Sequence, residues 1–454
     1  MAGEALASSS GIGPAWVGDT LNAGGHWRLR SKMPYLIGLM MLFDSWDSIV
    51  IAFTLPSIAA EWKLTAIQSG WLLSAGYAGQ LVGAIAAGSI AEIRGRLPVL
   101  RPLVIVMCVL AVLCGFAQEY GQLVALRLIQ GLAIGGALPV AVCYINEIAP
   151  AATRGRFFNT YHFLMLSGFA LASVASAFLV PTIGWRPLYW LGAAPLLLVP
   201  LLYGLPESPR WLAKHGRAEQ ARRALVRLGG EPPAELPAHV TSEPSAPRLP
   251  LSELYAKGPV RKVTAVMGTL WFLTAFVSFG LVNWVPSIYV SVFKISVAEA
   301  LRYNVIVGFA LLVIPLVLRQ TVDRFGRRPP AILGTALGGL SLLSLAVVIG
   351  VGGASQQLLV TLTIIGQIGA SIGSIILWPY TAEVFETRIR AMALGGASSL
   401  ARGASMVTPL GVGAVLALSG SIIPVFVIFG TVSVIVALLW VFATVETAGK
   451  EIDR

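Results

Sequence analysis

The chain has 454 residues, of which 56% are hydrophobic and 12% charged, and its mean hydropathy is +0.79. This composition, with apolar stretches of membrane-spanning length, excludes an ordinary soluble domain and predicts an all-α polytopic membrane protein. The chain carries 32 Lys and Arg against 21 Asp and Glu. Such a basic excess can indicate a nucleic-acid partner, but the positions of these charges in the loops, described below, indicate otherwise.

The first 33 residues are polar and rich in Gly and Ser, and they lack an apolar core followed by a cleavage site. We therefore expect a disordered tail rather than a signal peptide. Twelve apolar segments follow, each with the length of about 20 residues that a membrane-spanning helix needs. They are predicted at approximately 34–59, 66–91, 99–118, 121–147, 157–182, 185–205, 263–290, 300–320, 330–351, 356–384, 391–417 and 421–444.

Six segments precede one long polar loop and six follow it. The predicted domains are an N-terminal tail (1–33), a first six-helix bundle (34–205), a cytoplasmic loop (206–262), a second six-helix bundle (263–446) and a C-terminal tail (447–454). If both termini are cytoplasmic, most Lys and Arg lie on the inner side, as the positive-inside rule requires. We thus expect a multi-pass protein of the inner or plasma membrane, whose basic loops contact anionic lipid rather than nucleic acid.

Within the long loop, residues 208–228 place apolar side chains on one helical stripe with arginines opposite. This pattern predicts an amphipathic helix along the inner membrane surface. Residues 230–250 are rich in Pro, Glu and Ser and predict a flexible linker.

Two short loops repeat one pattern, an acid three residues before a glycine followed by arginine, after the second and the eighth span. In both halves the next inward-running helix, two spans further on, ends in a glutamate seven residues before another arginine. An acid beside a helix end and a nearby arginine can lock neighbouring helices together, and glycine permits the tight turn. We predict a cytoplasmic gate, although ordinary positive-inside charge remains an alternative. The predicted gating residues are Glu92, Gly95, Arg96, Glu147 and Arg154 in the first half, and Asp323, Arg324, Gly326, Arg327, Glu383 and Arg390 in the second.

These loops resemble the major facilitator superfamily, and the resemblance runs from about residue 34 to 450. PESPRWL at 206–212 resembles a signature of sugar porters and organic ion transporters, ETAGK at 446–450 resembles their closing motif, and RLIQG at 127–131 resembles a buried arginine motif. The resemblance implies a major facilitator fold of twelve transmembrane helices in two six-helix bundles, with a central cavity and alternating access. Glu92-Ile93 stands where the family favours Asp-Arg, which predicts a weaker first lock.

Charged residues inside the spans are the strongest functional signal. Asp44 and Asp47 lie three residues apart on one face of the first span. At 1.5 Å per residue, Asp47 is roughly 20 Å from the inner surface, and Arg127 in the fourth span is roughly 9 Å from the outer surface. In a core of about 30 Å these depths nearly coincide. We therefore predict an Asp47–Arg127 ion pair that, with Asp44, couples proton uptake to helix movement. A static pair that fixes helix packing is the alternative.

Arg402 interrupts the apolar run of the eleventh span. An unpaired arginine at the bilayer centre costs about 3 kcal/mol on insertion scales, so it normally faces a cavity, an acid or an anionic ligand. Its guanidinium matches a carboxylate with two parallel hydrogen bonds. We predict that it binds an organic anion, with a structural arginine as the alternative.

Two local resemblances also indicate a carboxylate substrate. Asp44-Ser-Trp-Asp47 resembles the paired aspartates of the aromatic acid:proton symporters, with serine in place of their usual glycine. Ser398-Ser399-Leu-Ala-Arg402-Gly403 resembles the eleventh span of the organic anion transporters.

Other polar and aromatic side chains at span depth are candidate substrate contacts. Aromatic rings can stack on a planar substrate, although most aromatics in membrane proteins are packing or interface residues. The candidate rings are Tyr77, Trp271, Phe276, Trp378 and Tyr380, and the candidate amides are Gln80, Gln130, Asn283 and Gln367.

Together these features predict a secondary active transporter that carries a small organic anion, aromatic or otherwise, with a proton. We expect a monomer in membrane lipid, with no cofactor besides the coupling proton, no metal site and no enzymatic activity, because the chain shows no metal-ligand spacing and no nucleophile–base arrangement. The alternatives are a sugar or polyol:proton symporter, an efflux transporter for metabolites or drugs, and a non-transporting sensor on the same fold.

Overall fold

A computed structural model of the protein describes residues 15–23, 28–233, 253–254 and 258–447, and within these ranges all regular secondary structure is helical. The first half contains α2 (Arg28–Trp62), α3 (Ala66–Arg94), α4 (Leu97–Gly115), α5 (Tyr120–Ile148), η1 (Ala151–Thr153), α6 (Arg154–Ile183), α7 (Arg186–Leu191), η2 (Ala194–Leu198) and α8 (Val199–Tyr203). The second contains α11 (Pro259–Ser291), α12 (Val297–Phe325), α13 (Arg328–Val351), α14 (Gln356–Val384), α15 (Thr387–Ser419) and α16 (Ile423–Phe442).

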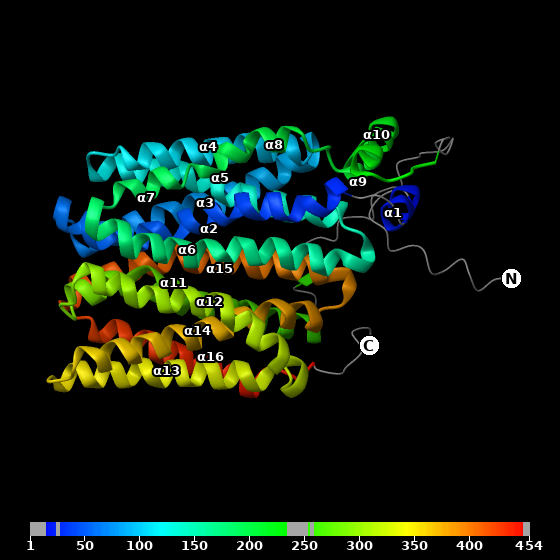
Figure 1. Ribbon diagram of the computed structural model, residues 1–454. Helices are drawn as coiled ribbons and strands as arrows, with labels where there is room; N and C mark the ends of the chain where they lie inside the picture. The colour runs from blue at the N-terminus through cyan, green and yellow to red at the C-terminus, as the bar shows by residue number, and fades with distance from the viewer. Residues whose placement is uncertain (1–14, 24–27, 234–252, 255–257, 448–454) are drawn as a thin grey trace.

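Among the described residues, eleven helices are long and apolar enough to cross a membrane. The sixth crossing is made by α7, η2 and α8, which follow one another along α4 (Figure 1). We predicted one continuous helix at 185–205. Pro195 and Pro200 each begin a new short helix, because proline has no N–H to continue the hydrogen bonding of the preceding turn.

The two bundles occupy the upper and lower halves of Figure 1. We call the end that carries α9 (Pro209–Lys214) and α10 (Ala218–Leu228) the α9–α10 face, and the other end the opposite face. The most extensive contacts between the bundles are those of α3 with α15, α6 with α12 and α2 with α11, and α2 also touches α12.

The apolar cores show how the bundles meet. Near the opposite face, one core of buried side chains spans both bundles and includes Phe53, Leu72, Trp284 and Phe429. Toward the α9–α10 face, each bundle has a separate core. The bundles are therefore closed against each other at the opposite face and packed independently at the α9–α10 face.

The N-terminal segment differs from the predicted disordered tail. Residues Ala15–Asn22 form the helix α1, and α2 begins at Arg28, six residues before the predicted span. Val17 and Leu21 of α1 are fully buried against α9 and α10, and Arg30 Nη1 donates a hydrogen bond of 2.8 Å to the carbonyl of Leu21.

The amphipathic stripe of the long loop is accordingly covered by protein, not by lipid headgroups. Trp211, Leu212, Ala221 and Leu225 pack under α1, and the predicted single helix is divided into α9 and α10 around Gly216, whose φ is +71°. Most of the predicted linker at 230–250 lies outside the described residues.

Glycines allow α3 and α15 to meet backbone to backbone near the opposite face. A Cβ atom on Gly70 would lie 2.7 Å from the carbonyl oxygen of Pro409, and one on Gly413 would lie 2.5 Å from that of Ala66. Neither neighbour can move easily, because both contact atoms belong to backbone.

We therefore expect Gly70→Leu or Gly413→Leu to separate the bundles at the opposite face. A cysteine introduced at Phe53 should then react several times faster with a membrane-impermeant maleimide added from that face. Gly411→Leu is the matched control, because a Cβ at Gly411 of α15 meets nothing within 4 Å. Equal labelling of all variants would show that this contact does not hold the bundles closed.

Candidate functional site between the bundles

Arg127 is the buried centre of a polar cluster in the first bundle. Its Nη2 donates a hydrogen bond of 3.1 Å to the backbone carbonyl of Asp47, and its Nη1 donates one of 2.8 Å to Gln130 Oε1. We expected an ion pair with the Asp47 carboxylate, but the observed contact is with the carbonyl. Both carboxylate oxygens of Asp47 are buried without a hydrogen-bond partner among the described residues.

Two glycines make room for these charges. A Cβ on Gly76 of α3 would lie 3.3 Å from Arg127 Nη2, and one on Gly192 would lie 2.7 Å from Asp47 Oδ1. Gly192 directly follows α7, at the break in the sixth crossing. The break thus lets the backbone pass close to the carboxylate. We did not identify Gly192 from the sequence, although the run Gly192-Ala-Ala-Pro195 marks the interruption.

Asp44 and Arg402 face each other from opposite bundles. Asp44 on α2 is 6% exposed, and its Oδ1 has no hydrogen-bond partner among the described residues. Arg402 on α15 is half-buried and interacts electrostatically with Asp44. Within the described part of the chain, its guanidinium makes no hydrogen bond or ion pair. On both helices these residues lie where the shared core ends.

Tyr77 and Asn283, two of the predicted substrate contacts, lie together. They come from α3 and α11, and their side chains are joined by hydrogen-bonding distances of 3.2 and 3.1 Å. Gln80 is also near the centre, with its amide 3.4 Å from Ser48 Oγ. The Tyr77–Asn283 contact connects the two bundles, whereas the Gln80–Ser48 contact lies within the first bundle.

Four other side chains that we predicted to contact substrate instead bind or pack against residues of their own bundle. Gln130 binds Arg127 and is fully buried, and Tyr380 packs on Trp440 with its hydroxyl 2.8 Å from the carbonyl of Val445. Trp271 Nε1 donates to Thr381, and the ring of Phe276 packs edge-on against Phe429. Tyr380 lies at the α9–α10 end of its helix, so its prediction as a substrate contact is corrected to a packing role.

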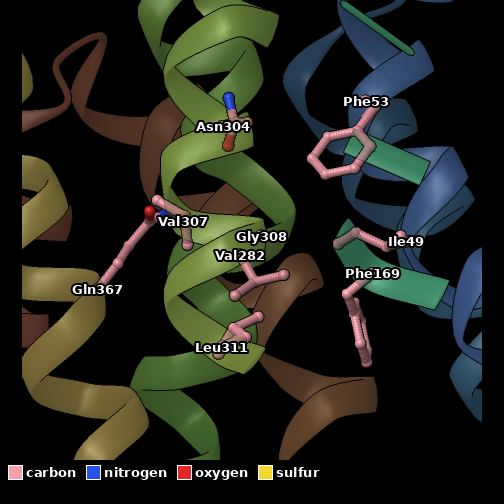
Figure 2. A pocket seen from close by; sticks show the side chains of 9 residues that line it. All are labelled: Ile49, Phe53, Phe169, Val282, Asn304, Val307, Gly308, Leu311 and Gln367. Atoms are coloured by element: carbon pink, nitrogen blue, oxygen red, sulfur yellow. The ribbon is translucent and has the colours of Figure 1, made fainter. Parts of the chain in front are cut away.

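Trp378 is 53% exposed and makes an edge-to-face contact with Trp271, with ring centroids 4.8 Å apart. Gln367 lies elsewhere, on a small cavity between the bundles (Figure 2). Asn304 lines the same cavity and was not identified from the sequence, because its position in α12 carries no local motif.

The repeated loops form matching charged networks. In the first half, Arg96 Nη2 lies 2.7 Å from Glu147 and 3.0 Å from Glu92, and the Glu207 carboxylate accepts the N–H of Leu97 at 3.0 Å. Burial raises the pKa of Glu207, against the opposing effect of the backbone N–H groups that it binds.

In the second half, Arg327 Nη2 lies 2.7 Å from Glu383. The Glu446 carboxylate accepts the N–H groups of Arg327 and Arg328 at 2.9 and 3.0 Å. PESPR and ETAGK thus each supply one glutamate that caps the helix after the repeated loop.

The remaining gating candidates are not part of these pairs. Arg154 has a buried Nε without a partner among the described residues, and Arg390 donates only to the carbonyl of Phe385. Arg324 lies over the ring of Phe325, and the side chain of Asp323 lies outside the described residues. Each ion pair between described side chains joins residues of the same half of the chain.

Both networks depend on a glycine in the left-handed region. Gly95 and Gly326 have φ values of +106° and +87°, and a Cβ on either would lie 2.6 or 2.5 Å from the capping glutamate. We expect Gly95→Ala to destabilise the protein by about 1–3 kcal/mol and to lower its melting temperature in detergent.

Gly326→Ala should have the same effect. Gly88→Ala is the control, because Gly88 of α3 is helical and a Cβ there meets nothing within 4 Å. Melting temperatures that match the control would mean that the loops relax without cost.

Two six-helix bundles that face each other across buried charges define a membrane transporter of the major facilitator superfamily. The chain belongs to the family described as "Sugar (and other) transporter", which it matches over residues 33–454.

Three similar proteins illustrate the range of the family. The niacin transporter NiaP of Acinetobacter baylyi is 28% identical over 422 residues, covering 92% of this chain and 94% of that protein. The benzoate transport protein of the same organism is 27% identical over 413 residues, covering 87% and 84%. The crystal structure of a D-xylose-proton symporter matches 94% of this chain and 100% of that chain, with a TM-score of 0.74 and 21% identity. This last likeness concerns the fold.

Proposed function

We propose that this protein is a proton-coupled symporter of a small organic anion, an aromatic or other small carboxylate, and that it works by alternating access. The observation that carries the proposal is Arg402, a half-buried guanidinium between the bundles that makes no hydrogen bond or ion pair within the described part of the chain. The names of the niacin and benzoate transporters support a carboxylate substrate.

A neutral sugar or polyol is the second candidate, because the xylose-proton symporter shares the fold. A neutral ligand does not require a second buried cation, whereas a carboxylate can neutralise Arg402 and fill both of its parallel donor positions. We therefore place the anion first.

The distribution of Lys and Arg supports a cytoplasmic α9–α10 face and cytoplasmic termini. In that orientation the shared core closes the outer side, and the protein is inward-facing. Glu147 and Glu383 are then paired within their own bundles, while Arg154 and Arg390 are left without carboxylate partners among the described residues. We propose that these arginines bind across the bundles when the cytoplasmic side closes.

Arg402→Lys should bind the anion about 10-fold more weakly or worse, although the charge is kept, because the loss of one charge-assisted hydrogen bond costs about 1.5–3 kcal/mol. Arg402→Ala should abolish carboxylate uptake in proteoliposomes while the protein still reaches the membrane. Arg302→Lys, an exposed arginine of α12, is the control. Unchanged affinity in Arg402→Ala would remove this residue from the site.

Asp47→Asn should uncouple the proton from the anion, because the variant side chain cannot gain or lose a proton. Accumulation driven by an inward proton gradient should disappear, while substrate binding and substrate exchange across the membrane persist. Asp44→Asn should change substrate binding as well, since Asp44 interacts electrostatically with Arg402.

Asp19→Asn on the exposed side of α1 is the matched control. If Asp47→Asn accumulates the anion as well as the unmutated protein at every pH, Asp47 is not the coupling residue.

A further inference from the structure

A small cavity lies between the bundles, within the shared core (Figure 2). Ile49, Phe53 and Phe169 line it from the first bundle, and the C-terminal bundle contributes Val282, Val307, Gly308 and Leu311 together with the amides of Asn304 and Gln367. About 20 Å³ of it is open to the centre of a water molecule, so in this arrangement it can hold a water but not an aromatic ring. Its walls belong to different bundles, and separation of the bundles at the opposite face would enlarge it.

Hydrogen bonds fix the orientation of both amides. Asn304 Nδ2 donates to the carbonyl of Ala300 at 2.7 Å, and Gln367 Nε2 donates to the carbonyl of Leu281 at 3.3 Å. In each amide the nitrogen donates to a backbone carbonyl, so the amide oxygen must point away from that carbonyl. Figure 2 shows the Asn304 oxygen directed toward Val307 and Gly308, and the Gln367 oxygen close to Val307.

Both oxygens are free to accept. Gln367 is 2% exposed, and its Oε1 is buried without a hydrogen-bond partner among the described residues. Asn304 is 4% exposed, and no described group donates to its Oδ1. A buried acceptor without a donor costs about 1–3 kcal/mol, so the Gln367 oxygen, with the Asn304 amide on the same cavity, favours a ligand that brings a donor.

We propose that Asn304 and Gln367 form a specificity subsite for a hydrogen-bond donor on the substrate ring, such as a phenolic hydroxyl. The inference rests on the proposed function, since the carboxylate of the same molecule binds Arg402. The apolar walls accept the ring, and the hydroxyl donates its hydrogen bond to the amide oxygen of Gln367 or Asn304. The subsite selects against a ring that carries only a hydrogen-bond acceptor at this position, because that acceptor and the amide oxygens would repel each other.

The test is isothermal titration of the full-length protein in lipid nanodiscs with four carboxylates of similar size: benzoate, 3-hydroxybenzoate, 4-hydroxybenzoate and pyridine-3-carboxylate. At least one hydroxybenzoate should bind about 10-fold more tightly than benzoate, the ratio that about 1.4 kcal/mol represents. Pyridine-3-carboxylate, whose ring nitrogen is an acceptor, should bind no better than benzoate.

Gln367→Met and Asn304→Leu keep the side-chain volume and remove the acceptors. In each variant, the ratio of the affinity for the preferred hydroxybenzoate to that for benzoate should fall toward one, through weaker binding of the hydroxybenzoate. Gln357→Met, an exposed glutamine on the same helix, is the matched control.

The possible failures are distinct. Equal binding of benzoate and both hydroxybenzoates to the unmutated protein would overturn the subsite even if the variants fail to fold, and so would a preference that survives both substitutions. If no carboxylate binds at all, the proposed function itself is wrong, and the subsite falls with it.

Discussion

The cost of burying charge in a membrane protein governs the centre of this molecule. Asp44, Asp47 and Arg127 are all nearly or fully buried, and Arg402 is half-buried beside them. An uncompensated charge at this depth costs several kcal/mol, so each must be balanced by another charge, a hydrogen bond or a ligand. Arg127 is balanced inside its own bundle by a carbonyl and an amide. Asp44 and Arg402 instead interact across the boundary between the bundles.

The charged loops at the α9–α10 face also balance buried or half-buried charges with an opposite charge or a hydrogen bond. Each links the ends of two neighbouring helices through an arginine and a glutamate, and each orients the next helix through a second glutamate on its N-terminal N–H groups. Because these contacts stay within one half of the chain, they make each bundle a rigid unit. The rotation of one bundle against the other that the proposed alternating access requires would leave these contacts intact.

The features that follow local sequence rules were predictable. Spans follow from apolar length, and a repeated pattern in short loops identified Arg96, Glu147, Arg327 and Glu383, although it did not show which of them pair. The sixth crossing was predicted as one helix because apolar length says nothing about where Pro195 interrupts it. We did not predict that residues 15–22 form a helix, because α1 is stabilised by contacts with α9 and α10, far along the chain.

Side-chain roles at the site were harder to predict than the elements that carry them. Gln130 had the right chemistry and depth, but depth does not reveal which way a side chain points, and Tyr380 lies too near the end of its helix. Asn304 was missed for the converse reason, since a single asparagine in an apolar helix becomes informative only when its amide nitrogen is known to be occupied.

The contact of α1 with α9 and α10 also bears on the order of events during synthesis. Residues 15–22 leave the ribosome long before residues 211–225, which form the apolar groove that buries Val17 and Leu21. During all the time that the first six crossings are inserted, this N-terminal segment has no binding surface. Its docking can therefore occur only after the first six crossings and the groove that follows them have been synthesised.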